Sequence, residues 1–492
     1  MKKKRICILL ALCMAFTLAG CGGTGNSDAH EPSVQTSDET STSKDTFADG
    51  DYKDVTNETP DATITLSGKT GTISDTTRGT SGREVTITSK GIYRVSGESD
   101  GVTIAINDTT ESGNVYLILD GVTMVSADAC IRIDACDKVI IQCVGDNTLT
   151  STGLAGTVDG TIYARDDLTV NGSGTLTITS AAHGIVGNDD VKITGATVVI
   201  DASSAGIKAH NSVRIGGGDI TISAGHDGVH VENDDGNGYF RMESGSLTIS
   251  SGDDGIHAES TLSISGGEVT VSKSYEGLEA LTVEISGGNI SVTADDDGIN
   301  AAGGSDTTST EKNPWGSSTG TLTISGGNIY VNASGDGLDS NGSLYITGGT
   351  VIVEGPTNGG NGALDKGDGN GCVASVTGGT VLAIGTADMA INFDSGTQCA
   401  ALVNLSGSAG DTITVSDGFT FTATKSFQCV VYSSPDLKEG NSYTLSAGNS
   451  SATADFSAGL YYSDVRGMGG GMMGGNMGGM MGGHMGGSPD RP

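Results

Sequence analysis

The sequence predicts an all-β protein built as a parallel β-helix, a solenoid whose coils are about 22 residues long. Three observations support this fold class. The 492 residues include 80 glycines but only 7 prolines, which indicates many tight turns rather than a disordered chain. Thr, Ser, Val and Ile are frequent and helical periodicity is missing, as expected of short strands. A glycine followed by an aliphatic residue also recurs at a nearly constant spacing between residues 184 and 337.

The repeat sets the coil length. The aligned glycines are separated by 22, 22, 27, 22, 21 and 39 residues, and they are Gly184, Gly206, Gly228, Gly255, Gly277, Gly298 and Gly337. Within residues 252–273 the apolar residues form three pairs at strand spacing: Ile256 with Ala258, Leu262 with Ile264, and Val269 with Val271. Three short strands per coil without a helical segment favour a parallel β-helix over a leucine-rich repeat. Because one coil cannot bury its inward residues alone, we expect a continuous core.

The N-terminus predicts export. It reads MKKKRICILLALCMAFTLAGC, a basic start, a short apolar run and small residues before a cysteine. LAGC at residues 18–21 resembles a bacterial lipobox. We therefore expect residues 1–20 to be a lipoprotein signal peptide and Cys21 to carry lipid, which places the protein on the extracellular face of the bacterial cell membrane; an ordinary signal peptide is the alternative. Residues 21–60 are rich in Ser, Thr, Asp and Glu and predict a flexible linker.

The rest of the chain divides into three parts. Strand patterns such as ATITLSG and KVIIQCV begin near residue 61, and we expect the β-helix to span residues 61–386. Residues 387–466 lose the glycine register and predict a C-terminal β cap over the open strand edges. Residues 467–492 are rich in Gly and Met and predict a disordered tail. Its methionines and His484 would suit copper, and a plain flexible extension is the alternative.

Net charge and cysteine content limit the classes of partner and metal site that the protein can have. The formal net charge of −34 repels nucleic acid and anionic lipid and attracts cations. The six cysteines after Cys21 include no C-x-x-C pair, so zinc and thioredoxin-type sites are disfavoured. We expect buried thiols, with one disulfide among Cys130, Cys136 and Cys143 as the alternative in an exported protein.

Two sets of side chains recur on consecutive coils. The first column precedes the repeated glycine and is acidic on five coils: Asp227, Asp254, Glu276, Asp297 and Asp336. The second column lies two residues after the glycine and comprises His230, His257, Glu279, Asn300 and Asp339. Equivalent positions of stacked strands recur about 4.8 Å apart. Unit charges about 5 Å apart repel by roughly 3 kcal/mol at an effective dielectric of 20. The first column therefore requires bound cations or protonation.

Calcium suits these groups outside a cell, because it takes carboxylate, amide and backbone oxygens in flexible geometry. The candidate ligands are the first column together with Asp253, Asp295, Asp296 and Asp339. The other second-column residues, His230, His257, Glu279 and Asn300, are candidate ligand-binding groups. A solvated acidic edge that prevents aggregation is the alternative. His230 and His257 could also hold a transition metal, although we expect both to be solvated outward residues.

Three sets of motifs point to a known family. They are NVYLILDGVTMVS with DKVIIQCVGDNTLTS, the DG-Ile/Leu/Val repeats with ISGG turns, and SFQCVVYSSPDLKEGNSYTL at residues 426–445. Over residues 61 to 456 the chain resembles the calcium-binding, carbohydrate-binding parallel β-helix proteins of clostridial bacteria. The resemblance implies a right-handed helix related in shape to pectate lyases, bound calcium, and non-catalytic binding of plant cell-wall polysaccharide, acidic pectic sugars such as polygalacturonate especially. The family's calcium ligands carry over most directly to Asp254, Asp296, Asp297 and Asp336.

The ligand and two rival functions can be reasoned from the residues. A uronic acid polymer would be repelled unless calcium bridges its carboxylates to those of the protein. A neutral glucan would need aromatic platforms, for which Trp315, in the insertion that lengthens the 39-residue step, is a candidate; a Trp that pins this loop is the alternative. A polysaccharide lyase is the first rival, with Lys208 or Lys273 as its base. A surface adhesin or structural stalk without a sugar ligand is the second rival.

Overall fold

The computed structural model describes residues 47–110, 113–154, 156–233, 235–302 and 320–465. The chain divides into two compact units, residues 1–46 and 47–492, and every described residue belongs to the second unit. The prediction of an all-β protein is confirmed, because these residues form strands β1 to β39 and only two 3-10 helices, η1 (Asp49–Asp51) and η2 (Phe456–Ala458). Across the described ranges, no helix has the length and apolar character needed to span a bilayer.

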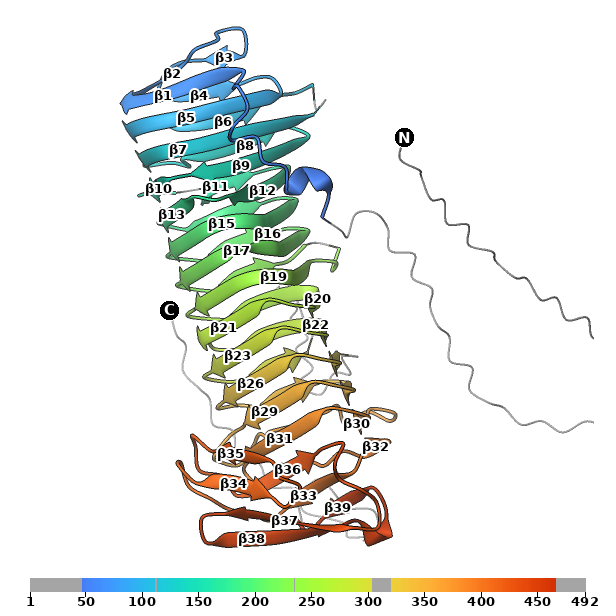
Figure 1. The fold of residues 1–492 in the computed structure, drawn as a ribbon. Helices are drawn as coiled ribbons and strands as arrows, with labels where there is room; N and C mark the ends of the chain where they lie inside the picture. The colour runs from blue at the N-terminus through green and yellow to red at the C-terminus, as the bar shows by residue number, and fades with distance from the viewer. Residues whose placement is uncertain (1–46, 111–112, 155, 234, 303–319, 466–492) are drawn as a thin grey trace, which may run out of the picture. The chain divides into compact units, whose positions relative to one another are not determined.

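Most of the strands stack coil upon coil and pair in parallel with their counterparts in the neighbouring coils, so that the chain advances along the stack in sequence order (Figure 1). Three faces result. The first face follows the repeated glycines and consists of β4 (Glu84–Ile87), β6 (Thr103–Asn107), β8 (Ile131–Ala135), β11 (Gly160–Ala164), β14 (His183–Gly187), β16 (Ile207–Ala209), β18 (Val229–Val231), the first halves of β20 (Ile256–Ile264) and β22 (Leu278–Ile285), β24 (Ile299–Ala301) and β27 (Leu338–Ser340).

The other two faces share several long strands that continue from one face onto the next. The second face comprises the first parts of β5 (Gly91–Asp100), β7 (Asn114–Ser126), β15 (Asp190–Ala202), β17 (Ser212–Ala224) and β19 (Tyr239–Ser250), the ends of β20 and β22, and β9 (Lys138–Val144), β12 (Asp167–Gly172), β25 (Thr321–Ile324), β28 (Ser343–Ile346), β30 (Ala374–Val376) and β32 (Ser395–Gly396). The third face comprises the remaining parts of the long strands with the end of β1 (Ala62–Gly68), β10 (Asp146–Ser151), β13 (Thr175–Ser180), β21 (Glu268–Lys273), β23 (Asn289–Ala294), β26 (Asn328–Ala333), β29 (Thr350–Glu354) and β31 (Thr380–Gly385). The beginning of β1 pairs with the first part of β5 and belongs to the second face.

The register follows the glycine alignment. Val229 of β18 pairs with Ile256 of β20, which pairs in turn with Leu278 of β22. Ile256, Leu262 and Val269, one from each predicted strand of a coil, are all fully buried in one core cluster that runs through the stack. Burying three inward pairs per coil against the neighbouring coils supplies the apolar contact that a single coil lacks.

Both ends of the described stack carry antiparallel strands. At the start, β1 pairs with β2 (Thr70–Ile73), and β3 (Gly79–Thr80) pairs with β4. At the other end, β36 (Cys429–Ser433) runs antiparallel to β31 and to β33 (Ala400–Val403), and β39 (Tyr461–Ser463) lies along β33. A separate antiparallel sheet follows the order β35 (Thr420–Thr422), β34 (Thr412–Val415), β37 (Ser442–Ala447) and β38 (Ser450–Asp455), over its own apolar cluster. These pairings occupy strand edges that would otherwise be open.

The prediction of a flexible linker is wrong for residues 47–60, because this segment lies against the second face of the coils. The Asp51 side chain is fully buried, pairs with Lys138, and accepts a hydrogen bond from Thr169 Oγ1 at 2.7 Å. The Val55 N–H donates to Gln142 Oε1 at 2.9 Å. The composition of this segment is typical of a spacer, but Asp51 and Val55 find specific partners that only the folded coils bring together. The tail of residues 467–492 lies outside the described residues.

The cysteines after Cys21 are free thiols. Cys130, Cys136, Cys143, Cys399 and Cys429 are buried, and Cys372 is partly exposed. Burial raises the pKa of Cys130 and that of Cys143 to about 12, so both remain protonated. The structure thus agrees with the expectation of buried thiols and has no disulfide among Cys130, Cys136 and Cys143.

Candidate cation site on the acidic columns

The first column is held in place by hydrogen bonds from one coil to the next. Asp227 Oδ1 accepts from the Asp254 N–H at 3.1 Å, and Asp297 Oδ1 accepts from the Asp336 N–H at 2.6 Å. Asp254 Oδ1 accepts from the Glu276 N–H at 3.3 Å. One oxygen of each of these carboxylates therefore orders the backbone of the following coil, and the other oxygen remains for a second partner.

Two histidines supply that partner in the N-terminal half of the columns. His230 Nδ1 lies 2.6 Å from Asp227 Oδ2, and His257 Nδ1 lies 2.7 Å from Glu279 Oε2 and 3.4 Å from Asp254 Oδ2. The expectation that both histidines are solvated is wrong, since His230 is 9 % exposed and His257 only 2 %. Both side chains alternate with core residues and point outward, but the rings stack on each other and are covered by the neighbouring coils.

His257 acts as an internal cation. Burial alone would lower its pKa, but the hydrogen bonds to Asp254 and Glu279 outweigh burial and raise the pKa to about 11. For Glu279, burial would raise the pKa, and the hydrogen bond and charge of His257 outweigh it and lower the pKa. A protonated His257 imidazole thus offsets the charge of Glu279, whereas burial, with repulsion from Glu279 and Asp227, raises the pKa of Asp254 to about 7.

In the C-terminal half, the residues that the structure describes supply no such internal cation. Asp297, Asp336 and Asp339 each place a carboxylate oxygen within 4.8 Å of the others. Among the described residues, no Lys, Arg or His forms an ion pair with any of the three. Gly335 makes room for this crowding, because a Cβ there would lie 2.3 Å from Asp297 Oδ1 and 2.4 Å from Asp296 Oδ1.

The pKa values of these three aspartates are raised. Burial raises the pKa of Asp336 to about 8, and the charges of Asp297 and Asp339 add to the shift. Burial and repulsion from Asp365 raise the pKa of Asp339 to about 7. Burial, again the largest cause, raises the pKa of Asp297 to about 6. The folded protein therefore holds three carboxylates whose ionisation is unfavourable until a cation joins them.

Asn300 links the two halves. Its Nδ2 donates to Glu276 Oε2 at 2.9 Å, and its neighbours in the second column are Glu279 and Asp339. Asn300 is 6 % exposed, yet its buried Oδ1 has no hydrogen-bond partner among the described residues. A buried acceptor without a donor is costly and calls for a donor or a cation. Burial raises the pKa of Glu276 to about 9, with repulsion from Glu279 as the next cause.

The remaining predicted residues fall into different places. Asp253 is exposed and forms a further carboxylate group with Asp227 and Asp254. Asp295 is exposed and joins no group of carboxylates among the described residues. Asp296 is partly exposed and interacts with the Tyr275 hydroxyl. Trp315 and Cys21 lie outside the described residues.

Two residues beside the columns were missed by the sequence analysis. Asp365 continues the second column, because Leu364 forms a bridge with Leu338. The glycine alignment skipped this coil since Ala363 replaces the glycine, although the string ALD matched GLD one coil earlier. Tyr275 is 50 % exposed beside Asp296, and the neighbouring acidic repeat drew attention away from this aromatic residue.

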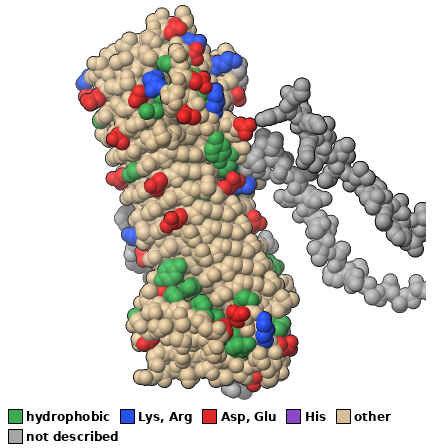
Figure 2. Space-filling view, viewed as in Figure 1, with side chains coloured by type: hydrophobic (Ala, Val, Ile, Leu, Met, Phe, Trp, Pro, Cys, Tyr) green, Lys and Arg blue, Asp and Glu red, His purple; other side chains and the backbone are tan. Residues whose placement is uncertain are grey.

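A separate carboxylate group shows what internal compensation looks like. Asp167, Asp189 and Asp190 also lie within 4.8 Å of one another. Lys192 Nζ lies 3.3 Å from Asp167 and 3.6 Å from Asp190, and Arg214 pairs with Asp190. Basic side chains pair with Asp167 and Asp190 of this group, while burial and repulsion from these two raise the pKa of Asp189. The group around Asp336 has no basic partner among the described residues. Figure 2 shows acidic side chains scattered over the visible face without forming a continuous patch.

Fold and site together define an all-β protein of stacked coils that carries an uncompensated carboxylate site on one face. Residues 81–311 match the family model described as "Carbohydrate-binding domain-containing protein". A protein of the same description from Acetivibrio thermocellus (strain ATCC 27405) is 34 % identical over 127 residues, which cover 24 % of this chain and 44 % of the relative. The chain thus spans less than half the length of that relative.

A solved structure is also similar. It is titled "Structure of the polysaccharide lyase-like protein from C. thermocellum, Gadolinium derivative", is 31 % identical, and is matched over 46 % of this chain and 92 % of that chain with a TM-score of 0.41. Together, the matches of family and sequence support a carbohydrate-binding family for the part of the chain that they cover.

Proposed function

We propose that this protein is an exported, lipid-anchored, right-handed parallel β-helix that binds carbohydrate through calcium. The observation that carries the proposal is the group of Asp297, Asp336 and Asp339, three carboxylates within 4.8 Å of one another without a basic partner among the described residues. The unpartnered Oδ1 of Asn300, next to Asp339 in the second column, adds a neutral oxygen of the kind that calcium accepts. A calcium ion there would offset the repulsion between the carboxylates.

The ligand that fits such a site is an acidic polysaccharide, for which polygalacturonate of the plant cell wall is our candidate. A calcium ion shared between protein and uronate carboxylates would join two polyanions that otherwise repel each other. Tyr275 offers a half-exposed aromatic face beside Asp296, on which a sugar ring could pack. Metal and aromatic ring would then act on the same polymer.

We expect binding without bond cleavage, and a lyase is the second candidate. Lys208 favours the lyase, because it is in register with His230 and forms no ion pair with a described acidic residue. Affinity electrophoresis through polygalacturonate tests binding, and ultraviolet absorbance of unsaturated uronides tests cleavage. We expect retardation with calcium, none with EDTA, and no rise in absorbance. A rise in absorbance would identify a lyase, and unchanged mobility in calcium would count against binding of this polymer.

The lipid anchor has its own test. Replacing Cys21 with Ser removes the sulfur that would carry the lipid, so the variant should appear in the culture medium while the unaltered protein fractionates with membranes. Retention of the Cys21→Ser protein in the membrane fraction would refute the anchor and leave the carbohydrate-binding proposal intact.

A further inference from the structure

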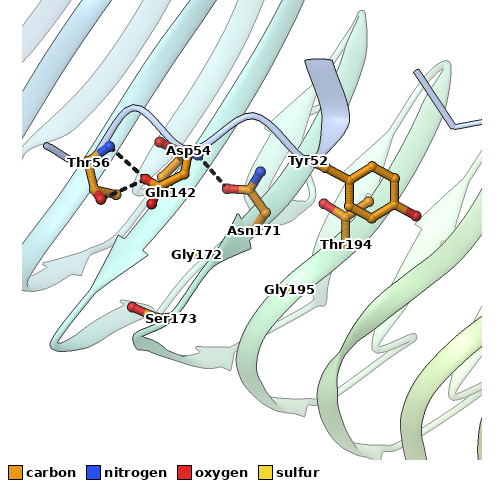
Figure 3. Close-up of a pocket in the computed structure, with 9 residues that line it drawn as sticks. All are labelled: Tyr52, Asp54, Thr56, Gln142, Asn171, Gly172, Ser173, Thr194 and Gly195. Atoms are coloured by element: carbon orange, nitrogen blue, oxygen red, sulfur yellow. Dashed lines mark hydrogen bonds between the residues drawn. The ribbon is translucent and has the colours of Figure 1, made fainter. Parts of the chain in front are cut away.

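A cleft of about 290 Å³ lies on the second face of the coils, beside the segment of residues 47–60 (Figure 3). Residues of this segment form one side, and residues of β9, β12 and β15 form the other. The lining residues are Tyr52, Asp54, Thr56, Gln142, Asn171, Gly172, Ser173, Thr194 and Gly195. Its volume is close to the lower end for small-ligand pockets, about 300 Å³. This cleft contains none of the residues of the acidic columns.

The aromatic part of the cleft is Tyr52, which is 49 % exposed. Its ring packs on Phe47, with centroids 5.6 Å apart, and lies beside Thr194 in Figure 3. Its hydroxyl approaches Gly216, where a Cβ would lie 2.3 Å from the oxygen. Glycine at this position therefore permits the ring to sit close to the coils, and the ring is fixed before any ligand arrives.

The polar wall of the cleft is also ordered in advance. Gln142 Nε2 donates to Asn171 Oδ1 at 2.8 Å, and Asn171 Nδ2 donates to the Asp51 carbonyl at 2.8 Å. Both amides are at least 96 % buried, since Gln142 is 1 % and Asn171 4 % exposed. They fasten the segment to the coils and fix the shape of the wall.

Two lining groups remain available to a ligand. Asp54 uses Oδ1 to accept from the Thr56 N–H at 2.8 Å and Oγ1 at 2.6 Å, and its Oδ2 makes no hydrogen bond to a described residue. The exposed Ser173 hydroxyl likewise makes none. A carboxylate oxygen and a hydroxyl next to an aromatic ring can hydrogen-bond sugar hydroxyls while the ring covers the C–H face of the sugar.

The charge of the cleft selects against acidic sugars. None of the residues lining it is basic, and Asp54 places a carboxylate at its edge. The basic groups next to the lining are already paired, Arg94 with Asp120 and Lys53 with Glu58. A uronate would therefore meet the Asp54 carboxylate without a free compensating cation, whereas a neutral sugar can donate a hydroxyl hydrogen to it. We propose that the cleft between residues 52–56 and strands β9, β12 and β15 binds an uncharged pyranose unit of a polysaccharide, with Tyr52 stacking on the ring and Asp54 and Ser173 holding its hydroxyls. The inference rests on the proposed carbohydrate-binding function but not on the calcium site.

Calorimetric titration in EDTA tests the cleft separately from the metal. The probes are cellohexaose, xylohexaose and mannohexaose, with trigalacturonate as the acidic comparison. We expect at least one neutral hexaose to bind, trigalacturonate not to bind, and Tyr52→Ala to weaken the neutral sugar by about tenfold or more, as for loss of an aromatic anchor. Failure of all three neutral sugars to bind the unaltered protein would overturn the proposal.

Further variants keep the result interpretable if Tyr52→Ala disturbs folding. Ser173→Phe changes an exposed residue and fills the cleft, so it should abolish neutral-sugar binding without lowering the melting temperature. Tyr461→Ala removes an exposed tyrosine of β39, to which no binding role is assigned, and should leave neutral-sugar binding unchanged. Unchanged binding by both Tyr52→Ala and Ser173→Phe would place the sugar elsewhere and refute the cleft. If a neutral sugar binds in EDTA but calcium does not cause retention by polygalacturonate, only the calcium mechanism is refuted. If calcium causes this retention but no neutral sugar binds in EDTA, only the cleft proposal is refuted.

Discussion

The rings of His230 and His257 stack with their centroids 5.1 Å apart and their planes inclined by 12°, although 27 residues separate them in the chain. Each imidazole faces a carboxylate, Asp227 for His230 and Glu279 for His257. The His257 imidazole thereby offsets the charge of Glu279 from within the protein. Asp297, Asp336 and Asp339 have no such basic partner among the described residues.

Replacing His257 should show how much its positive charge stabilises the folded protein. In His257→Gln, Asp254 and Glu279 lose their buried positive partner, and breaking a buried ion pair costs about 3–5 kcal/mol. Urea denaturation in EDTA measures the loss. We expect calcium to restore part of it by occupying the place of the lost charge. The exposed His210 provides the control, since His210→Gln should change neither the urea midpoint nor its calcium dependence. A His257→Gln protein as stable as the original would show that the His257 imidazole is neutral.

Calcium should stabilise the unaltered protein through Asp297 and its neighbours. Free calcium at about 100 times its dissociation constant adds roughly 2.7 kcal/mol per site, because the unfolded chain lacks the assembled group. Asp297→Asn should remove most of this increment, while its amide oxygen can still accept the Asp336 N–H. Thermal melting with calcium, magnesium or EDTA checks this, and magnesium should substitute poorly. The matched control is Asp295→Asn, an exposed position outside the group. Equal stabilisation by sodium chloride of the same ionic strength would argue for a solvated acidic edge.

Without metal, stability should fall as pH rises. The pKa values of Asp336 and Asp339 are raised from 3.8 to about 8 and about 7. Between pH 4 and 8 the folded state therefore binds more protons than the unfolded state, and the free energy of unfolding decreases with increasing pH. Urea midpoints in EDTA should be lower at pH 8 than at pH 5. Saturating calcium should weaken or reverse this fall in stability, because it favours the ionised carboxylates. A urea midpoint in EDTA that rises from pH 5 to pH 8 would contradict the raised pKa values of Asp336 and Asp339.

Glu354 should hold the C-terminal sheet to the coils. This fully buried carboxylate accepts hydrogen bonds from the Thr424 N–H at 2.7 Å, Thr424 Oγ1 at 2.6 Å and the Tyr330 hydroxyl at 2.6 Å. Glu354→Ala leaves these donors without a partner, which costs about 1–3 kcal/mol for each one that water cannot reach. Limited proteolysis should cut the variant first within residues 404–428. Glu268→Ala, at an exposed position, is the control, and identical cleavage of both variants would exclude the role of Glu354.

Asp51 should fasten the segment of residues 47–60. Burial would raise its pKa, but the hydrogen bonds from Lys138 and Thr169 outweigh burial and lower it. The contribution of Asp51 to stability is therefore present above the unfolded pKa and lost as pH falls through the folded value, opposite in sign to that of Asp336. Hydrogen exchange at pH 7 should show the Val55 amide protected in the unaltered protein and exchanging faster in Asp51→Ala. Asp49→Ala, at an exposed neighbour, should leave that protection unchanged.

Much of the fold follows from local sequence periodicity. Ile256, Leu262 and Val269 alternate with polar residues at strand spacing, and a glycine fixes the same point of each coil, so the inward residues could be predicted. The columns follow from the same repeat, since residues at one coil position become neighbours in space. Where another residue replaces the glycine, as Ala363 does, the glycine alignment did not detect the coil, and Asp365 was therefore not predicted.

Other parts of the site depend on contacts that no local pattern encodes. The burial of His257 results from neighbouring coils, although its alternation with Ile256 and Ala258 placed it on the outer side. The attachment of Asp51 to Lys138 joins residues 87 apart in sequence. Polar residues such as these are typical of spacers and surfaces by composition, and only the assembled coils provide their partners.

The antiparallel pairings at both ends of the stack have a consequence for how such a chain can evolve. Strands β1 to β4 close one end and β31, β33 and β36 close the other, while the coils between them pair in parallel with local register shifts at some strands. Residues 256–277 form one such coil, and their removal would place Leu278 where Ile256 now pairs with Val229. Whole coils can therefore be gained or lost by duplication or deletion without altering either end. The distance between the cleft at Tyr52 and the carboxylates around Asp336 is then a heritable quantity that changes in steps of one coil, about 4.8 Å each.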